Sequence, residues 1–174
     1  MNALATIDVL PAFCWDDVYT KVNAWRGACM HHFSQVEMAV TQTLLALDAA
    51  KPDGASLRLR HLIGQQYEDL DAAISPNGPF GNAGKSACDA LSWYRTQHEA
   101  FRVLLCHGTI KVYVERNGHW LLVVRSLSIR SRQAAYDEQT IEQSAAQERL
   151  LALKRDGLNL SAALGNLRKT TQLK

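Results

Sequence analysis

The sequence predicts a mainly α-helical fold, an antiparallel helical bundle with an inserted β-hairpin. Apolar residues recur every three or four positions in three segments: 15–50, 56–74 and 85–107. Between 109 and 126 the apolar period changes to two, on either side of Asn117-Gly118, which is a strong hairpin signal. A helical pattern then returns over 137–170. We therefore expect the order helix, helix, helix, hairpin, helix.

The first helical segment runs from Trp15 to Ala50 and ends at a turn signal, the sequence KPDG over 51–54. Its length fits either one helix of about 35 residues or two helices that break near Gly27. Because a glycine inside a helix costs only about 1 kcal/mol, Gly27 alone does not decide between the two.

The second segment is expected to be helical from Ser56 to Ile74, and the clearest loop of the sequence follows it at 75–82. The third helix is expected from about Lys85 to His107. Gly108 stands where a helix C-terminal glycine belongs.

In the hairpin, Ile110, Val112 and Val114 share one face of the first strand, and 120–126 supplies the second strand. A third short strand near 127–132 is an open alternative. The C-terminal segment, about 137–170, is expected to form two helices, because Asp156-Gly157 interrupts its apolar pattern.

Composition points to one globular domain over residues 1–174, with 47% apolar and 21% charged residues. A net charge of +2 predicts neither nucleic-acid nor membrane binding. We find no run of 18 apolar residues and no signal peptide, so we expect a cytoplasmic protein without a membrane span. The four cysteines lack the spacing of a zinc site, and we expect no metal and no cofactor.

Familiar catalytic motifs such as G-x-S-x-G and H-E-x-x-H are missing from the sequence. An arginine lies five or six positions before a histidine in three pairs: Arg26 with His31, Arg26 with His32, and Arg102 with His107. Chance alone predicts about one such pair in a chain of this composition, so the spacing by itself is a weak signal. Only the last pair directly precedes a helix-ending glycine and a hairpin.

The segment FRVLLCHG, Phe101 to Gly108, resembles the R-x(4–6)-H motif of the HEPN superfamily. The resemblance covers about 33–125 and includes the helix order and the hairpin that carries Gly118-His119-Trp120. It implies a helical-bundle domain that dimerises. Many members are metal-independent ribonucleases of toxin and defence systems, and others have lost activity and serve in binding. Val103 takes the place of the polar residue, often Asn, that usually follows the arginine.

A metal-free ribonuclease needs a base for the ribose 2′-OH, a cation for the phosphate and an acid for the leaving oxygen. His107 can move a proton near neutral pH and Arg102 can hold a phosphate, which leaves the set one group short. Residues five apart on a helix also point about 140° apart. The resemblance implies a two-fold dimer that places two such pairs across one cleft.

A structural interpretation of the same residues stays open. Arg102 could pair with Glu99 or Asp89 on its own helix, and His107 could donate to a carbonyl at the helix end. More weakly, Arg116, His119 and Arg125 could form a basic rim for RNA, against the alternative of a solvated strand face.

The first functional hypothesis is therefore a HEPN-like, metal-independent endoribonuclease of a toxin or defence system that uses Arg102 and His107. Its expected partners are RNA, a second copy of the chain, and an antitoxin or another product of a neighbouring gene. The alternative is a catalytically inactive HEPN-like dimeric module for binding. A third, weaker hypothesis is a small-molecule sensor with an apolar pocket between helices.

Overall fold

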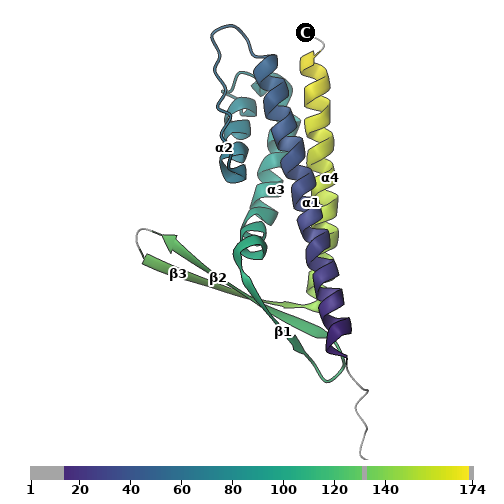
Figure 1. Cartoon of the computed structure of the whole chain (residues 1–174). Coiled ribbons are helices and arrows are strands. Elements are labelled where there is room, and N and C mark those ends of the chain that lie inside the picture. Colours follow the sequence, from purple (N-terminus) through teal and green to yellow (C-terminus); the bar gives the residue numbers. More distant parts are fainter. Residues whose placement is uncertain (1–13, 131–132, 173–174) are drawn as a thin grey trace, which may run out of the picture.

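The computed structural model describes residues 14–130 and 133–172. It confirms a mainly α-helical fold that contains a hairpin. The chain forms α1 (Trp15–Ala49), α2 (Ile63–Ile74), α3 (Gly81–His107), β1 (Thr109–Val114), β2 (Trp120–Arg130), β3 (Gln133–Glu142) and α4 (Gln143–Gln172). The helices lie side by side, and the sheet crosses one end of them (Figure 1).

One continuous helix of 35 residues, α1, extends through Gly27, which settles the alternative left open by the sequence. Its buried stripe runs from Val18 to Leu47 and forms the centre of the hydrophobic core. Burying this stripe against the other helices outweighs the helix propensity lost at one glycine.

The expected helix from Ser56 is wrong at its start, because α2 begins only at Ile63. An ion pair holds the preceding segment against α2. The Nε and backbone N–H of Arg60 donate to the carboxylate of Asp69, at 2.9 and 3.1 Å, and the Asp69 side chain is almost fully buried. In a helix that began at Ser56, the backbone N–H of Arg60 would donate to the carbonyl of Ser56 and would not be available to Asp69.

Two glycines allow close contacts around α3. A Cβ at Gly84 would lie 2.7 Å from the Cβ of Ile74, so a side chain there would push α2 and α3 apart. Gly108 has an extended backbone (φ −80°) rather than a left-handed one. Its Cβ would lie 2.6 Å from Cγ1 of Val124, so glycine is needed here for the close approach of β2.

The predicted hairpin is confirmed as β1 and β2, which pair antiparallel from Thr109↔Arg125 to Val114↔Trp120. Gly118 in the turn has φ +83°, a conformation that favours glycine. The prediction of helix from 137 is wrong, because β3 pairs with β2 as far as Leu121↔Glu142. Part of the expected third strand, 127–130, extends β2, and 131–132 lie outside the described residues.

The expected pair of C-terminal helices is a single helix, α4, that continues through Gly157. A Cβ at Gly157 would lie 3.1 Å from Cγ2 of Val36, so this glycine brings α4 close to α1. The indole N–H of Trp25 donates to the carbonyl of Ala146 at 2.8 Å. Each of these two contacts joins residues 121 positions apart, so α1 and α4 run parallel (Figure 1). The expected antiparallel arrangement is therefore wrong for this pair, because the sheet between α3 and α4 returns the chain in the direction of α1, and it holds for α3, which runs antiparallel to both.

Beyond Arg125, β2 and β3 leave the bundle as a two-stranded ribbon (Figure 1). In the described ranges, no helix is both long and apolar enough to cross a membrane.

Candidate functional site

Arg102 lies on α3 and is tied to α1. Its Nε donates to Oε1 of Glu37 at 2.5 Å, and both side chains are partly buried. Neither carboxylate suggested by the sequence is this partner, and Glu99 instead accepts from Arg95 at 2.9 Å. The ion pair therefore joins two helices, and not two turns of one helix.

The pair is electrostatically tight. Burial alone would lower the pKa of Arg102, but the hydrogen bond and the negative charge of Glu37 outweigh this and raise that pKa. The bond to Glu37 uses Nε, and no hydrogen bond of the two terminal nitrogens is found within 14–130 and 133–172. These nitrogens are the donors that a phosphate group would use.

A second guanidinium lies at the end of α3. Nη2 of Arg26 donates to the carbonyl of Leu105 at 3.2 Å, where the last turn of a helix has free carbonyls. Cys106 is close enough to both arginines for their charges to act on its thiol, which lies 3.8 Å from the sulfur of Met30. The pKa of this thiol is raised, mainly by burial. The negative charge of Glu37 also raises it, and the positive charges of Arg102 and Arg26 lower it, so all three charges lie near Cys106.

Arg26 and Glu37 are not among the site residues that the sequence predicted. A signal for them exists, because Arg26, Met30 and Glu37 are spaced four and seven residues apart on α1. This spacing places them on one flank of the helix, beside the apolar stripe.

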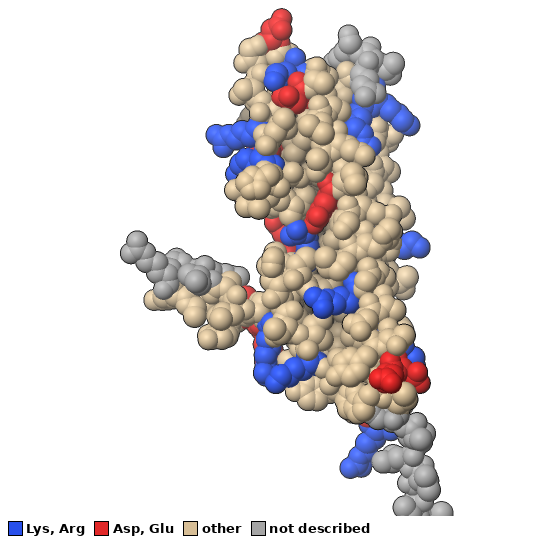
Figure 2. All heavy atoms as spheres, in the orientation of Figure 1, with Lys and Arg blue, Asp and Glu red and all other residues tan. Residues whose placement is uncertain are grey.

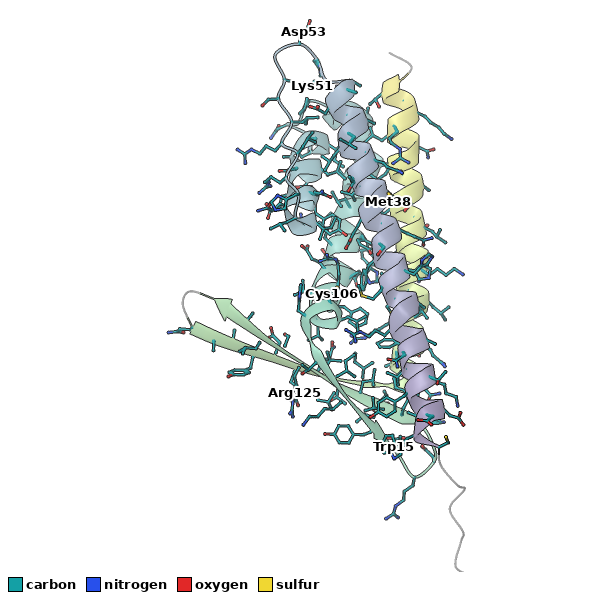
Figure 3. The ribbon with its side chains drawn as sticks, in the orientation of Figure 1. Trp15, Met38, Lys51, Asp53, Cys106 and Arg125 are labelled. Carbon is teal, nitrogen blue, oxygen red and sulfur yellow. The ribbon has the colours of Figure 1, made fainter. Side chains whose placement is uncertain are left out.

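His107 is the last residue of α3, and its side chain is exposed. Because α3 stays helical to its end, His107 and Arg102 point about 140° apart and their Cα atoms lie about 7.5 Å apart along the axis. We find no hydrogen bond between them in the described part of the chain. A single copy thus places Glu37 against Arg102, with His107 about one and a half turns away. Cys106, labelled in Figure 3, marks this end of α3.

The three basic residues of the hairpin lie in two places. Arg116 and His119 are exposed in the turn between β1 and β2, at the far end of β1 from His107. Arg125 is in register with Thr109, two residues after His107, and forms an ion pair with Glu138 on β3 (Figure 3). The structure therefore brings one of the three close to the end of α3, and Glu138 already balances its charge.

Two tyrosines form the inner wall beside the Arg102–Glu37 pair. The hydroxyls of Tyr67 and Tyr94 are buried, and neither has a hydrogen-bond partner among the described residues. Burial raises both pKa values above the usual range, Glu37 raises them further, and Arg102 partly offsets the rise. The wall therefore stays neutral near physiological pH, and Arg102 and Glu37 are two of the charged groups that act on both hydroxyls.

A separate concave surface lies on the other side of α3. This cavity of about 980 Å³ is bordered by α3, α4 and the ribbon, and both Arg149 and Glu138 line it. At its wall, Nε2 of His98 and Oδ2 of Asp156 are joined by a buried hydrogen bond of 2.9 Å. Burial would raise the pKa of Asp156, but hydrogen bonds from Arg155, His98 and Trp93 together lower it.

Within the described ranges, no group of three or more His, Cys, Asp or Glu side chains is arranged to hold a metal ion. Models of protein families, curated protein sequences and solved structures give no match to this chain.

Proposed function

We propose that this chain is a HEPN-like protein that cleaves RNA without a metal ion, with Arg102, His107 and Glu37 as its reacting groups. The observation that carries the proposal is the carboxylate of Glu37 on the guanidinium of Arg102. Arg102 and His107 alone lack one of the three groups that the reaction needs. Glu37 is our candidate for the missing base, and its carboxylate is held next to Arg102, the group that would bind the phosphate.

The proposed reaction uses the nucleophile that RNA carries. The 2′-oxygen attacks the adjacent phosphorus, Glu37 accepts the 2′-OH proton, and His107 gives a proton to the departing 5′-oxygen. Arg102 stabilises the charge that builds on the phosphate oxygens. The P–O5′ bond breaks as the P–O2′ bond forms, so the products are a 2′,3′-cyclic phosphate and a 5′-hydroxyl.

Biological context follows from the same resemblance. We propose a toxin or defence role, in which a partner protein restrains cleavage. Arg125, whose strand position adjoins His107, and the turn residues Arg116 and His119 would contact the RNA backbone. In the HEPN families, the motif pairs of two copies face one cleft, and a dimer of that kind would add a second histidine to the set.

The second candidate is an inactive HEPN-like binding module, and the same ion pair favours it. Arg102 bridges α1 and α3, which is sufficient structural use for a partly buried arginine. Val103 beside it is apolar and 44% exposed, which suits a surface that contacts a protein.

The test is cleavage of a mixed RNA pool in the presence of EDTA. We expect the wild type to produce 2′,3′-cyclic phosphate ends, and His107→Ala to reduce the rate at least about 100-fold. His61→Ala is the matched control, because His61 is also exposed but lies before α2, and it should cleave like the wild type. Wild-type protein that leaves the pool intact over a wide concentration range would support the binding module. Cleavage that needs Mg²⁺ or survives His107→Ala would contradict the mechanism.

A further inference from the structure

The outer side of α1 carries no Lys, Arg, Asp or Glu side chain over most of its length. Between residues 23 and 45, the exposed positions of this helix hold no Lys, Arg, Asp or Glu: Asn23, Ala24, Gly27, His31, Ser34, Gln35, Met38, Gln42 and Leu45. The charged residues of this stretch, Arg26 and Glu37, are both turned toward α3. In Figure 2 the outer surface along α1 is mostly free of charged atoms. A solvated helix face normally alternates charges of both signs.

Large apolar side chains protrude from this side and from the adjoining edge of α4. Met38 and Leu45 of α1 are 61% and 58% exposed, and Leu151 and Leu158 of α4 are 67% and 58% exposed. Each pair is spaced seven residues apart, so each forms a row along its helix. Because the two helices run parallel with an offset of 121 residues, Leu158 lies level with Met38. We define the uncharged face as the exposed α1 positions from 23 to 45 together with Leu151 and Leu158. Lys154, which is exposed between these two leucines, lies at its border.

The uncharged face has hollows next to its protrusions. A groove of about 430 Å³ lies between the two helices, with Met38 and Leu158 on its borders and Gly157 and Ser161 in its lining. Further down α1, a Cβ at Gly27 would meet nothing within 4 Å. This exposed glycine in the middle of a helix therefore has no packing role within the chain, although it costs about 1 kcal/mol of helix stability.

We propose that a second copy of the chain packs on the uncharged face, about a two-fold axis near the level of His31 and Ser34. The two α1 helices would then cross in opposite directions. Met38 of one copy would lie against Gly27 and Ala28 of the other, which fits a protrusion to a hollow on both sides of the axis. A two-fold interface needs such a patch that complements itself.

The area and charge of the uncharged face agree with this occupant. The stretch from 23 to 45 is about 35 Å long, and two helices side by side are about 20 Å wide, so the contact would remove on the order of 1,300 Å² from water. Stable interfaces bury about 1,200–2,000 Å² in total. RNA does not fit, because Lys154 is the only cationic Lys or Arg among the residues that line the groove.

This dimer does not depend on the proposed RNA cleavage. Arg102 and Glu37 lie on the flank of α1 that faces α3, outside the uncharged face. Association through this face would therefore leave each copy with its own site, and it is a different contact from the HEPN-type dimer, in which two motif pairs face one cleft. The mass of the particle tests the dimer and the RNA ends test the reaction, so either proposal can fail alone.

The experiment is light scattering with size-exclusion chromatography on the full-length protein. We expect a dimer at micromolar concentration, and we expect Met38→Glu combined with Leu158→Glu to raise its dissociation constant at least about 100-fold, because the carboxylates would be buried without partners. The matched control is Tyr136→Glu on the ribbon, since Tyr136 is 79% exposed and lies on a different surface. It should remain a dimer.

Cross-linking provides a second measurement that does not rely on weakened association. Cys14 is a free and exposed cysteine, so it is replaced first. In this Cys14→Ser background, Ser34→Cys should be joined to its counterpart by a short bismaleimide, and the background protein alone should not. Three results would overturn the proposal: a monomeric wild type at about 100 µM, a dimer that the double Glu substitution leaves intact, or an apolar face that instead binds lipid vesicles as a monomer.

Discussion

Two sides of α1 differ in whether their side chains have partners within the chain. On the flank toward α3, Arg26 donates to the end of that helix and Glu37 accepts from Arg102, so each charge has a partner within the chain. On the outer side, Met38 and Leu45 are more than half exposed, with no charged residue between them. The folded chain explains the first flank by itself. For the second side we propose that a second copy of the chain covers it.

The difference separates two kinds of surface on one helix. A charge that is paired inside the chain stabilises the fold and can also take part in chemistry. An exposed apolar row adds nothing to the stability of the single chain, because burial is the source of its free energy. Substitutions on the flank toward α3 should therefore change the stability of the single chain, and substitutions on the outer side should change its association.

The largest expected effect on stability is at the buried pair of His98 and Asp156. Asp156→Ala should lower the free energy of unfolding by about 3 kcal/mol or more, because it leaves a buried imidazole without its acceptor. Urea unfolding followed by circular dichroism would measure it. Asp48→Ala is the control, since the pair of Asp48 with Lys51 is on the surface and should contribute less than about 1 kcal/mol. Equal losses in the two variants would contradict this view of paired charges.

Glu37→Gln should affect both function and stability. We expect cleavage of RNA to fall at least about 100-fold, because an amide cannot accept the 2′-OH proton. The free energy of unfolding should fall by about 1–2 kcal/mol, because the partly buried Arg102 loses its counter-charge. A variant that is less stable yet cleaves at the wild-type rate would assign Glu37 to the fold alone.

Acid should weaken the fold through two aspartates. Hydrogen bonds from Arg60 lower the pKa of Asp69 against the effect of burial, and those from Arg155, His98 and Trp93 do the same for Asp156. Both carboxyls thus bind protons more readily in the unfolded chain. Their stabilisation is fully present above the unfolded pKa, near 4, and is lost as the pH falls through the lower folded values.

Urea unfolding at about pH 7, pH 5 and pH 3 would show this loss below about pH 4. Asp69→Asn should flatten the slope in the acid range, because one of the two groups no longer titrates. A slope that Asp69→Asn leaves unchanged would mean that other carboxyls control the acid sensitivity.

Tyr67→Phe should raise stability slightly, by up to about 1 kcal/mol, because it removes a buried hydroxyl that has no partner among the described residues. Thermal unfolding would measure it, with Tyr113→Phe as the control, since that side chain is 47% exposed. A marked loss of stability in Tyr67→Phe would show that this hydroxyl has a partner after all.

Gly27→Ala should have the smallest effect and opposite signs on the two equilibria. The helix should gain about 0.5–1 kcal/mol, measured by urea unfolding at high dilution. The dimer should weaken, because the new methyl group occupies the hollow that we assign to Met38 of the partner. A variant that is more stable but associates as strongly as the wild type would show that the interface does not include Gly27.

Much of this chain could be predicted from local patterns. The period of apolar residues gave α1 and α3 to within a few residues, and Asn117-Gly118 located the first hairpin. The residues of the candidate site were only partly within reach. Arg102 and His107 stand in one short segment, but the partner of Arg102 is 65 residues away, on another helix.

What the sequence by itself determined is therefore the type of most elements, because helix period and turn chemistry depend on near neighbours along the chain. Only the tertiary structure decided that 137–142 is a strand, since β2 offers it a pairing edge, and that α2 starts late, since Asp69 binds Arg60. It also decided which side of α1 stays exposed to solvent in the single chain. The sequence lists the apolar residues, but exposure depends on where distant helices pack, and that separates Met38 from the core.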